Sequence, residues 1–176
     1  MRLLLVLSSL TSLLAHADAL LVDRIVAVVD LQAITRSAME ERAQPLLLQA
    51  KTAEQRTQAR REALTDLIED ALISRDARKM RLEVSDDEVE SAFAAVAQQN
   101  QLSTAELTAE TKRQGIDVTQ YRAMLKRKIL ELKWLNVRLN RAALPEADAE
   151  RGAFYSSERS RLVAELRSGA VIEVRL

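Results

Sequence analysis

Paired carboxylates are the residues of this sequence whose spacing could support chemistry, because two acids can act as general acid and general base. Asp86 and Asp87 are such a pair. They fall inside Ser85-Asp86-Asp87-Glu88, a capping-box pattern typical of the first turn of a helix. We therefore interpret the pair as a helix start and not as a catalytic site.

Nucleophilic and metal chemistry have few residues available. The sequence contains no cysteine, and its single histidine, His16, lies in an apparent signal peptide. The mature chain would therefore lack disulfides, thiol nucleophiles, histidine triads and His-ligated metals. A glycine-rich phosphate loop is also absent. We expect no enzyme activity, no cofactor and no metal.

The N-terminus has the pattern of a cleavable export signal. Arg2 is followed by an apolar run, Leu3 to Leu14, and then by Ala15-His16-Ala17, a small-x-small cleavage pattern. The run is shorter than the roughly 20 residues that span a bilayer. An uncleaved anchor is the alternative. We expect residues 1–17 to be removed, leaving a periplasmic protein without a membrane span.

Composition predicts one soluble domain after export. Hydrophobic residues make up 48% of the chain, which is enough for a core. The 26 basic and 26 acidic residues balance, so the net charge does not favour binding to nucleic acid.

Hydrophobic periodicity and capping residues predict a mainly helical fold. Thr35 is a plausible N-cap, and Pro45 should kink or interrupt the helix that follows it. Gly115 should stop one helix, and Gly152 belongs to an expected linker. The expected helices are 36–49, 53–80, from Ser85 to about Asn100, from Ser103 to Gly115, 117–141 and 155–168.

Two β-type segments lie at opposite ends of this helical sequence. The first is Val22–Val29, with a turn at 30–32 and a short return strand, Ala33-Ile34. The second is Ala170–Leu176, in which Ile172, Val174 and Leu176 alternate with charged residues. With few other partners available, the two segments are expected to pair and close the chain into one module.

Charge is unevenly distributed. Residues 83–110 carry seven acidic and no basic side chains, whereas residues 117–141 carry seven basic ones. The two regions either face each other in the fold or form a basic groove wall that attracts acidic partner segments.

Several of these segments, in the same order, resemble the family of SurA-type periplasmic chaperones. Val22–Asp30 with Ile34–Ser37 resembles the start of the mature family, and Leu64–Ile73 resembles its second-helix signature. Val84–Val89, Gly115–Asp117 with Tyr121-Arg122, and the terminal strand continue the similarity. The family usually has Asn and an acid where this chain has Asp30-Leu31.

The resemblance implies a domain organisation. Residues 18–143 would be the N-terminal helical chaperone domain, and 155–176 would return to complete it. Relatives insert one or two parvulin-type prolyl isomerase domains between these parts, where this chain has only a linker, 144–154. A parvulin site also uses histidine, so isomerase activity is not expected.

The resemblance further implies a holdase that binds unfolded exported or outer-membrane β-barrel proteins in an apolar groove. The alternative is a non-catalytic assembly subunit that docks to one partner, or a homodimer that exchanges terminal elements. Each groove candidate has core packing or helix stapling as its alternative. The candidates are Met39, Leu46, Leu47, Leu48, Met124, Trp134, Phe154 and Tyr155.

Overall fold

The computed structural model describes residues 23–139 and 148–175. The predicted signal peptide, Val22 and Leu176 lie outside these residues, as do 140–147. The described elements are β1 (Ile25–Val29), β2 (Gln32–Thr35), α1 (Arg36–Gln49), α2 (Ala53–Lys79), α3 (Asp86–Gln99), α4 (Thr104–Arg113), α5 (Val118–Arg138), α6 (Asp148–Ser168) and β3 (Ile172–Val174). The expected mainly helical class is confirmed.

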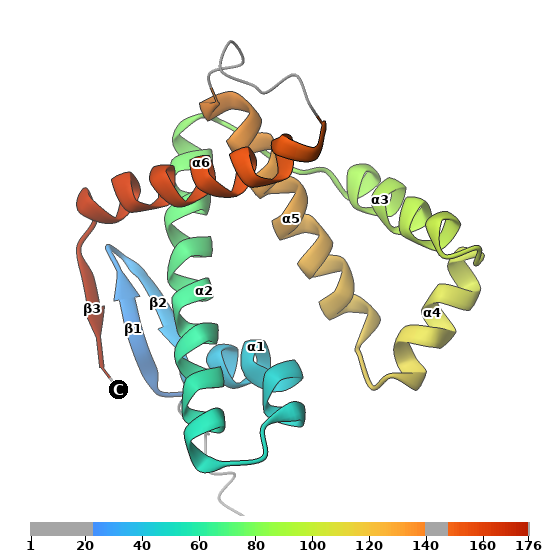
Figure 1. Cartoon of the computed structure of the whole chain (residues 1–176), viewed down its shortest axis with the longest axis horizontal. Coiled ribbons are helices and arrows are strands. Elements are labelled where there is room, and N and C mark those ends of the chain that lie inside the picture. Colours follow the sequence, from blue (N-terminus) through green and yellow to red (C-terminus); the bar gives the residue numbers. More distant parts are fainter. Residues whose placement is uncertain (1–22, 140–147, 176) are drawn as a thin grey trace, which may run out of the picture.

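The predicted pairing of the chain ends is confirmed. β1 is the central strand of a three-stranded antiparallel sheet with the order β2-β1-β3 (Figure 1). Ala27 lies opposite Val174, and Val29 lies opposite Ile172. β1 and β2 form the predicted hairpin through a turn at Asp30 and Leu31. The sheet therefore joins segments from both ends of the sequence.

Asp30 holds this junction together in several ways. Its φ of 52° lies in the left-handed region, which Asp tolerates better than most residues. Its backbone N–H donates to the Val171 carbonyl at 2.8 Å, and its carboxylate accepts from the Val171 N–H at 3.0 Å. The same carboxylate forms an ion pair with Arg75 of α2. The hydrogen bond from Val171 and the contact with Arg75 lower the pKa of Asp30.

The predicted alternation of β3 is only partly correct. Ile172 packs against the core, as expected, but Val174 is half-exposed. Ile172 packs against the main cluster but Val174, two residues further along, does not, so the part of β3 that covers the core ends at Ile172.

Most helix starts agree with the capping pattern. The side chains of Thr35, Ser85, Ser103 and Asp117 each accept a hydrogen bond from a backbone N–H of the following turn. Helix α1 continues through Pro45, so the interruption that was one of the two expected effects of this proline does not occur.

The last helix starts earlier than predicted. α6 begins at Asp148, so most of the expected linker 144–154 is helical, and residues 144–147 lie outside the described residues. Gly152 is exposed, and nothing lies close to the position of a Cβ there. The helix therefore carries this glycine at a modest propensity cost.

The buried apolar side chains form two clusters. The larger one joins β1, α1, α2, the C-terminal half of α5, and α6. The smaller one lies among α3, α4 and the N-terminal half of α5, around Phe93, Ala97 and Leu107. Figure 1 accordingly shows α3 and α4 as an arm beside the main body, with α5 belonging to both.

Candidate functional site

A cleft of about 830 Å³ lies among α1, α2, α5 and α6. Figure 1 shows α6 crossing both α2 and α5, so helices from the N-terminal half and the C-terminal half of the sequence lie together here. The cleft is lined by Arg42, Asp66, Glu69, Asp70, Lys128, Glu131, Leu132, Leu135, Asn136, Tyr155, Ser156 and Arg159. Its volume falls within the range of ordinary ligand-binding pockets.

Ion pairs connect the walls of the cleft. Arg159 of α6 donates to Glu69 of α2 at 2.8 Å and also forms an ion pair with Glu131 of α5. Arg42 of α1 lies 2.6 Å from the Asp70 carboxylate of α2. These contacts fix the spacing of all four helices.

The ion pairs also shift proton affinities. Burial alone would raise the pKa of Glu131, but hydrogen bonds from Arg159 and Lys128 outweigh it and lower the pKa. For Arg159, hydrogen bonds from the guanidinium to Glu131 and Glu69 outweigh burial and raise the pKa. Both groups are therefore held in their charged forms.

Asp66 differs from the other lining carboxylates. Among the described residues, no hydrogen bond or ion pair engages its side chain. Desolvation by the cleft walls raises the pKa of Asp66, the Arg42 charge opposes that shift, and Asp70 and Glu69 add to it. The cleft therefore contains one carboxylate without a direct cationic partner.

The apolar part of the cleft comes from α5 and α6. Leu132 is 49% exposed, Leu135 is buried beneath it in the core, and Tyr155 is partly buried. The wall is thus a mixture of aliphatic, aromatic and charged groups. Such a lining suits reversible binding of polypeptide, since it offers burial together with polar contacts.

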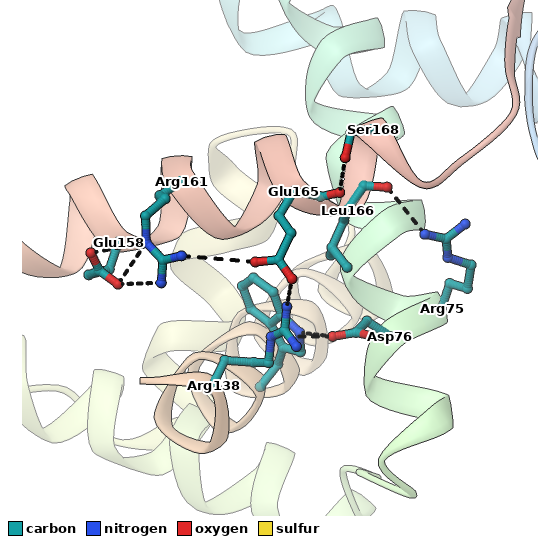
Figure 2. Close-up of polar contacts among 9 residues, drawn as sticks. Arg75, Asp76, Arg138, Glu158, Arg161, Glu165, Leu166 and Ser168 are labelled. Atoms are coloured by element: carbon teal, nitrogen blue, oxygen red, sulfur yellow. Dashed lines mark hydrogen bonds and ion pairs between the residues drawn. The ribbon is translucent and has the colours of Figure 1, made fainter. Parts of the chain in front are cut away.

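A second polar cluster attaches α6 to the rest of the body. In Figure 2, Arg138 of α5 lies between Asp76 of α2 and Glu165 of α6. The Arg138–Glu165 distance is 3.0 Å. The Trp134 indole Nε1–H donates to the Asp76 carboxylate at 2.9 Å, in a buried position. Arg75 adds a hydrogen bond to the Leu166 carbonyl at 3.3 Å.

The structure distributes the predicted groove residues over different environments. Met39 and Trp134 are fully buried in the core, and Leu47 and Phe154 pack partly against it. Leu46, Leu48 and Met124 are exposed but do not line the cleft. Tyr155 alone among the eight predicted residues lines it. Met39 and Trp134 therefore take the core packing that was their alternative.

Sequence reasoning missed the charged walls of the cleft. Asp66, Glu69 and Asp70 are spaced so that all three lie on one face of α2. That spacing was the available signal. The partners Arg42, Glu131 and Arg159 lie on three other helices, so only the tertiary structure brings them together.

The acidic and basic regions face each other, as one of the two sequence interpretations predicted. Arg122 lies 2.6 Å from Glu90, Lys126 lies 3.2 Å from Asp86, and Lys133 lies 2.5 Å from Glu88. These pairs join α5 to α3. The basic side chains involved are thereby neutralised within the molecule.

The described residues show neither a metal-binding group nor a membrane helix. In the resolved ranges, the acidic side chains do not form a cluster of three or more that could hold a metal ion. None of the helices described is both long and apolar enough to cross a bilayer.

Comparison with known proteins identifies the family. Residues 22–134 match the model of the SurA N-terminal domain. The chain belongs to the SurA N-terminal domain family. In this family member, only residues 139–147 separate α5 from α6, so no further domain is inserted between these helices.

Individual relatives agree with this family. The chain is 33% identical to chaperone SurA of Cupriavidus metallidurans over 113 residues, which are 62% of this chain and 23% of that protein. It is 29% identical to chaperone SurA of Pectobacterium atrosepticum over 144 residues, 78% of this chain and 33% of that protein. The chain therefore spans about a quarter to a third of these relatives.

A solved structure shows the same fold. It comes from work on PEB4 and the periplasmic protein Cj1289, described as two structurally related SurA-like chaperones of Campylobacter jejuni. The TM-score is 0.50 at 20% identity, with 78% of this chain and 50% of that chain covered. At this level of identity, the likeness shows a shared fold.

Proposed function

We propose that this protein is a periplasmic holdase that binds unfolded exported or outer-membrane β-barrel proteins without catalysis. The observation that carries the proposal is the open, mixed-character cleft between α1, α2, α5 and α6 in a member of a chaperone family. A holdase needs no reacting group. It needs exposed apolar surface and polar contacts that adapt to many sequences.

Exposed apolar residues outside the cleft extend the proposed client surface. Leu46, Leu48 and Met124 are accessible, and Leu48 is 83% exposed. Exposed side chains of this kind could contact parts of a long unfolded segment that lie outside the cleft. The predicted export signal and the SurA relatives support the proposed periplasmic location.

The test is suppression of aggregation. The mature chain is mixed with several unrelated unfolded barrel proteins, and light scattering is followed after dilution from denaturant. We expect protection of all of them. Protection of none, combined with tight binding to one native protein, would instead identify an assembly subunit.

A matched pair of variants locates the binding surface. Leu132→Asn removes an apolar side chain from the cleft, whereas Val137→Asn removes one elsewhere on α5, where Val137 is 58% exposed and does not line the cleft. We expect Leu132→Asn to weaken protection and Val137→Asn to leave it unchanged. Equal effects of the two variants would argue against the cleft as the binding surface.

A further inference from the structure

The cations that line the cleft are already committed to partners. Arg42 pairs with Asp70 at 2.6 Å, Arg159 pairs with Glu69 and Glu131, and Lys128 pairs with Glu131 at 3.1 Å. Arg127, just outside the lining, adds a second cation 3.7 Å from Asp70. An acidic client group would therefore have to displace an existing ion pair.

Asp66 is the remaining charged group of the wall. Within the described residues it has no cation in ion-pair contact, although Arg42 and Arg159 stand near enough to act on it through space. The groups on the neighbouring turn, Glu69 and Asp70, are also carboxylates. In the part of the chain that the structure describes, the one charged side chain of the cleft lining without an ion pair is therefore negative.

The rest of the lining accommodates the stem of a long cationic side chain. Leu132 is half-exposed, and Tyr155 offers an aromatic ring at the same cleft. Arginine and lysine bury their methylene stems on apolar surface while their charged heads seek an acid or an aromatic face. Charge and apolar surface in this cleft therefore complement the same kind of side chain.

We propose that the cleft selects extended client segments in which an arginine or lysine lies among apolar residues, with Asp66 pairing with the cationic head. This rests on the proposed holdase function and names the class of segment that the same site prefers. Charge complementarity favours such a segment over an acidic peptide. The side chains present do not form a metal site in the described residues, so a metal ion is not the expected cation.

Binding of two matched peptides tests the proposal. One fluorescently labelled peptide alternates leucine and tyrosine with arginine, and its twin carries neutral citrulline in place of arginine. Fluorescence anisotropy with the full chain should give a two- to fivefold lower Kd for the arginine peptide, at roughly the strength of one accessible ion pair. High salt should reduce this advantage.

Variants assign the preference to one residue. Asp66→Asn should remove the difference between the two peptides, and Asp66→Lys should reverse it toward an acidic peptide. Asp87→Asn is the control, because Asp87 is an exposed acid on α3 outside the cleft. Circular dichroism of each variant verifies that the fold is retained. The effect of salt on peptide binding is measured with the unaltered chain, so that test does not depend on any variant folding.

The outcomes separate this inference from the proposed function. Equal affinity for both peptides, or an arginine preference that survives Asp66→Asn, would overturn the inference. Binding of neither peptide by a chain that still prevents aggregation would overturn it while leaving the holdase function intact. Self-association that the arginine peptide cannot displace would show that a second copy occupies the cleft, again overturning the inference. If the unaltered chain neither binds the peptides nor prevents aggregation, both proposals are overturned.

Discussion

At the scale of single residues, the Trp134 indole and the Asp76 carboxylate form the most buried polar contact between α5 and α2. Trp134 is 0% exposed, and its Nε1–H donates to Asp76 at 2.9 Å. Arg138 lies 3.7 Å from the same carboxylate and supplies its counter-charge. With these two partners, the buried carboxylate has both a hydrogen-bond donor and a counter-charge. Without the carboxylate, the buried indole N–H would have no acceptor.

Removal of this carboxylate should strongly destabilise the fold. Asp76→Ala is expected to cost about 3 kcal/mol, because it leaves a buried indole N–H without an acceptor and leaves Arg138 with only the more exposed Glu165 as its counter-charge among the described residues. Chemical denaturation followed by circular dichroism measures the loss. Glu165→Ala is the matched control, since Glu165 is more exposed and its removal leaves Arg138 paired with Asp76. A similar cost for both variants would contradict the importance of the buried contact.

Replacement of Asp66 should stabilise the fold, in contrast to replacement of Asp76. The pKa of Asp66 is raised above the ordinary 3.8, so the folded state holds a proton more readily than the unfolded state does. The ionised form therefore destabilises the fold at neutral pH, and this effect fades as pH falls through the folded pKa. We expect Asp66→Asn to melt at a higher temperature than the unaltered chain at pH 7.

The comparison across pH makes that prediction specific. The advantage of Asp66→Asn should shrink as the solution is acidified toward the ordinary carboxyl pKa. Asp87→Asn, on the exposed start of α3, should show no stabilisation at either pH. A lower melting temperature for Asp66→Asn at pH 7 would mean that the carboxylate contributes to stability.

At the scale of elements, α6 is held on the body by Arg159, which reaches both α2 and α5. Its partner Glu131 has a pKa below the ordinary 4.5, so Glu131 contributes stability above that value. The contribution disappears as pH falls through the lowered folded pKa. Docking of α6 is therefore expected to weaken in acid.

Glu131→Gln tests this electrostatic attachment. The variant should be less stable than the unaltered chain at pH 7 and equally stable well below pH 4, where both are uncharged at this position. Thermal unfolding at a series of pH values gives the difference. Lys128→Gln is a milder control, because Lys128 is exposed and Arg159 would still pair with Glu131. A stability difference independent of pH would exclude an ionic origin.

The elements themselves could be predicted to very different degrees. Ser85, Ser103 and Asp117 mark helix starts because capping is a contact within one turn, and each start agrees with the structure. The start of α6 was misjudged because Gly152 resembles a linker residue, yet it lies within the helix. Capping residues therefore predict a helix start reliably, because the hydrogen bonds that they make lie within a single turn.

The cleft could not be predicted from such contacts within one turn. Trp134 lies off the main apolar stripe of its helix, yet it is fully buried in the larger cluster and donates a hydrogen bond to Asp76 of α2, so it is a core residue. Asp66 and Arg159 contribute to one wall from helices that are distant in sequence. Only the packing of α1, α2, α5 and α6 decides which side chains remain accessible between them.

At the scale of the whole molecule, one short strand joins the two ends of the described chain. β3 covers one edge of β1, and its neighbour Val171 makes two hydrogen bonds with Asp30. Ala170 and Ile172 also pack against the main core. Loss of this segment would expose a strand edge and part of the apolar core together.

Deletion of residues 170–176 should therefore unfold or aggregate the protein. We expect a large fall in melting temperature, measured by circular dichroism, and increased light scattering at rest. Arg175→Gln is the control, since it alters only an exposed ion pair with Glu173 and keeps the strand. A truncated chain with the melting temperature of the full chain would refute the structural role of β3.

The position of β1 between β2 and β3 has a consequence for the order of folding. β2 follows β1 after a two-residue turn, whereas Ile172 reaches Val29 only after almost the whole described chain has been placed. The hairpin and the α3–α4 arm depend on contacts close in sequence, and such contacts form fastest. Closure by β3 must overcome the entropy of a very long loop and is expected to come last. Until residues 172–174 pair with it, β1 would thus keep one edge open to other strands.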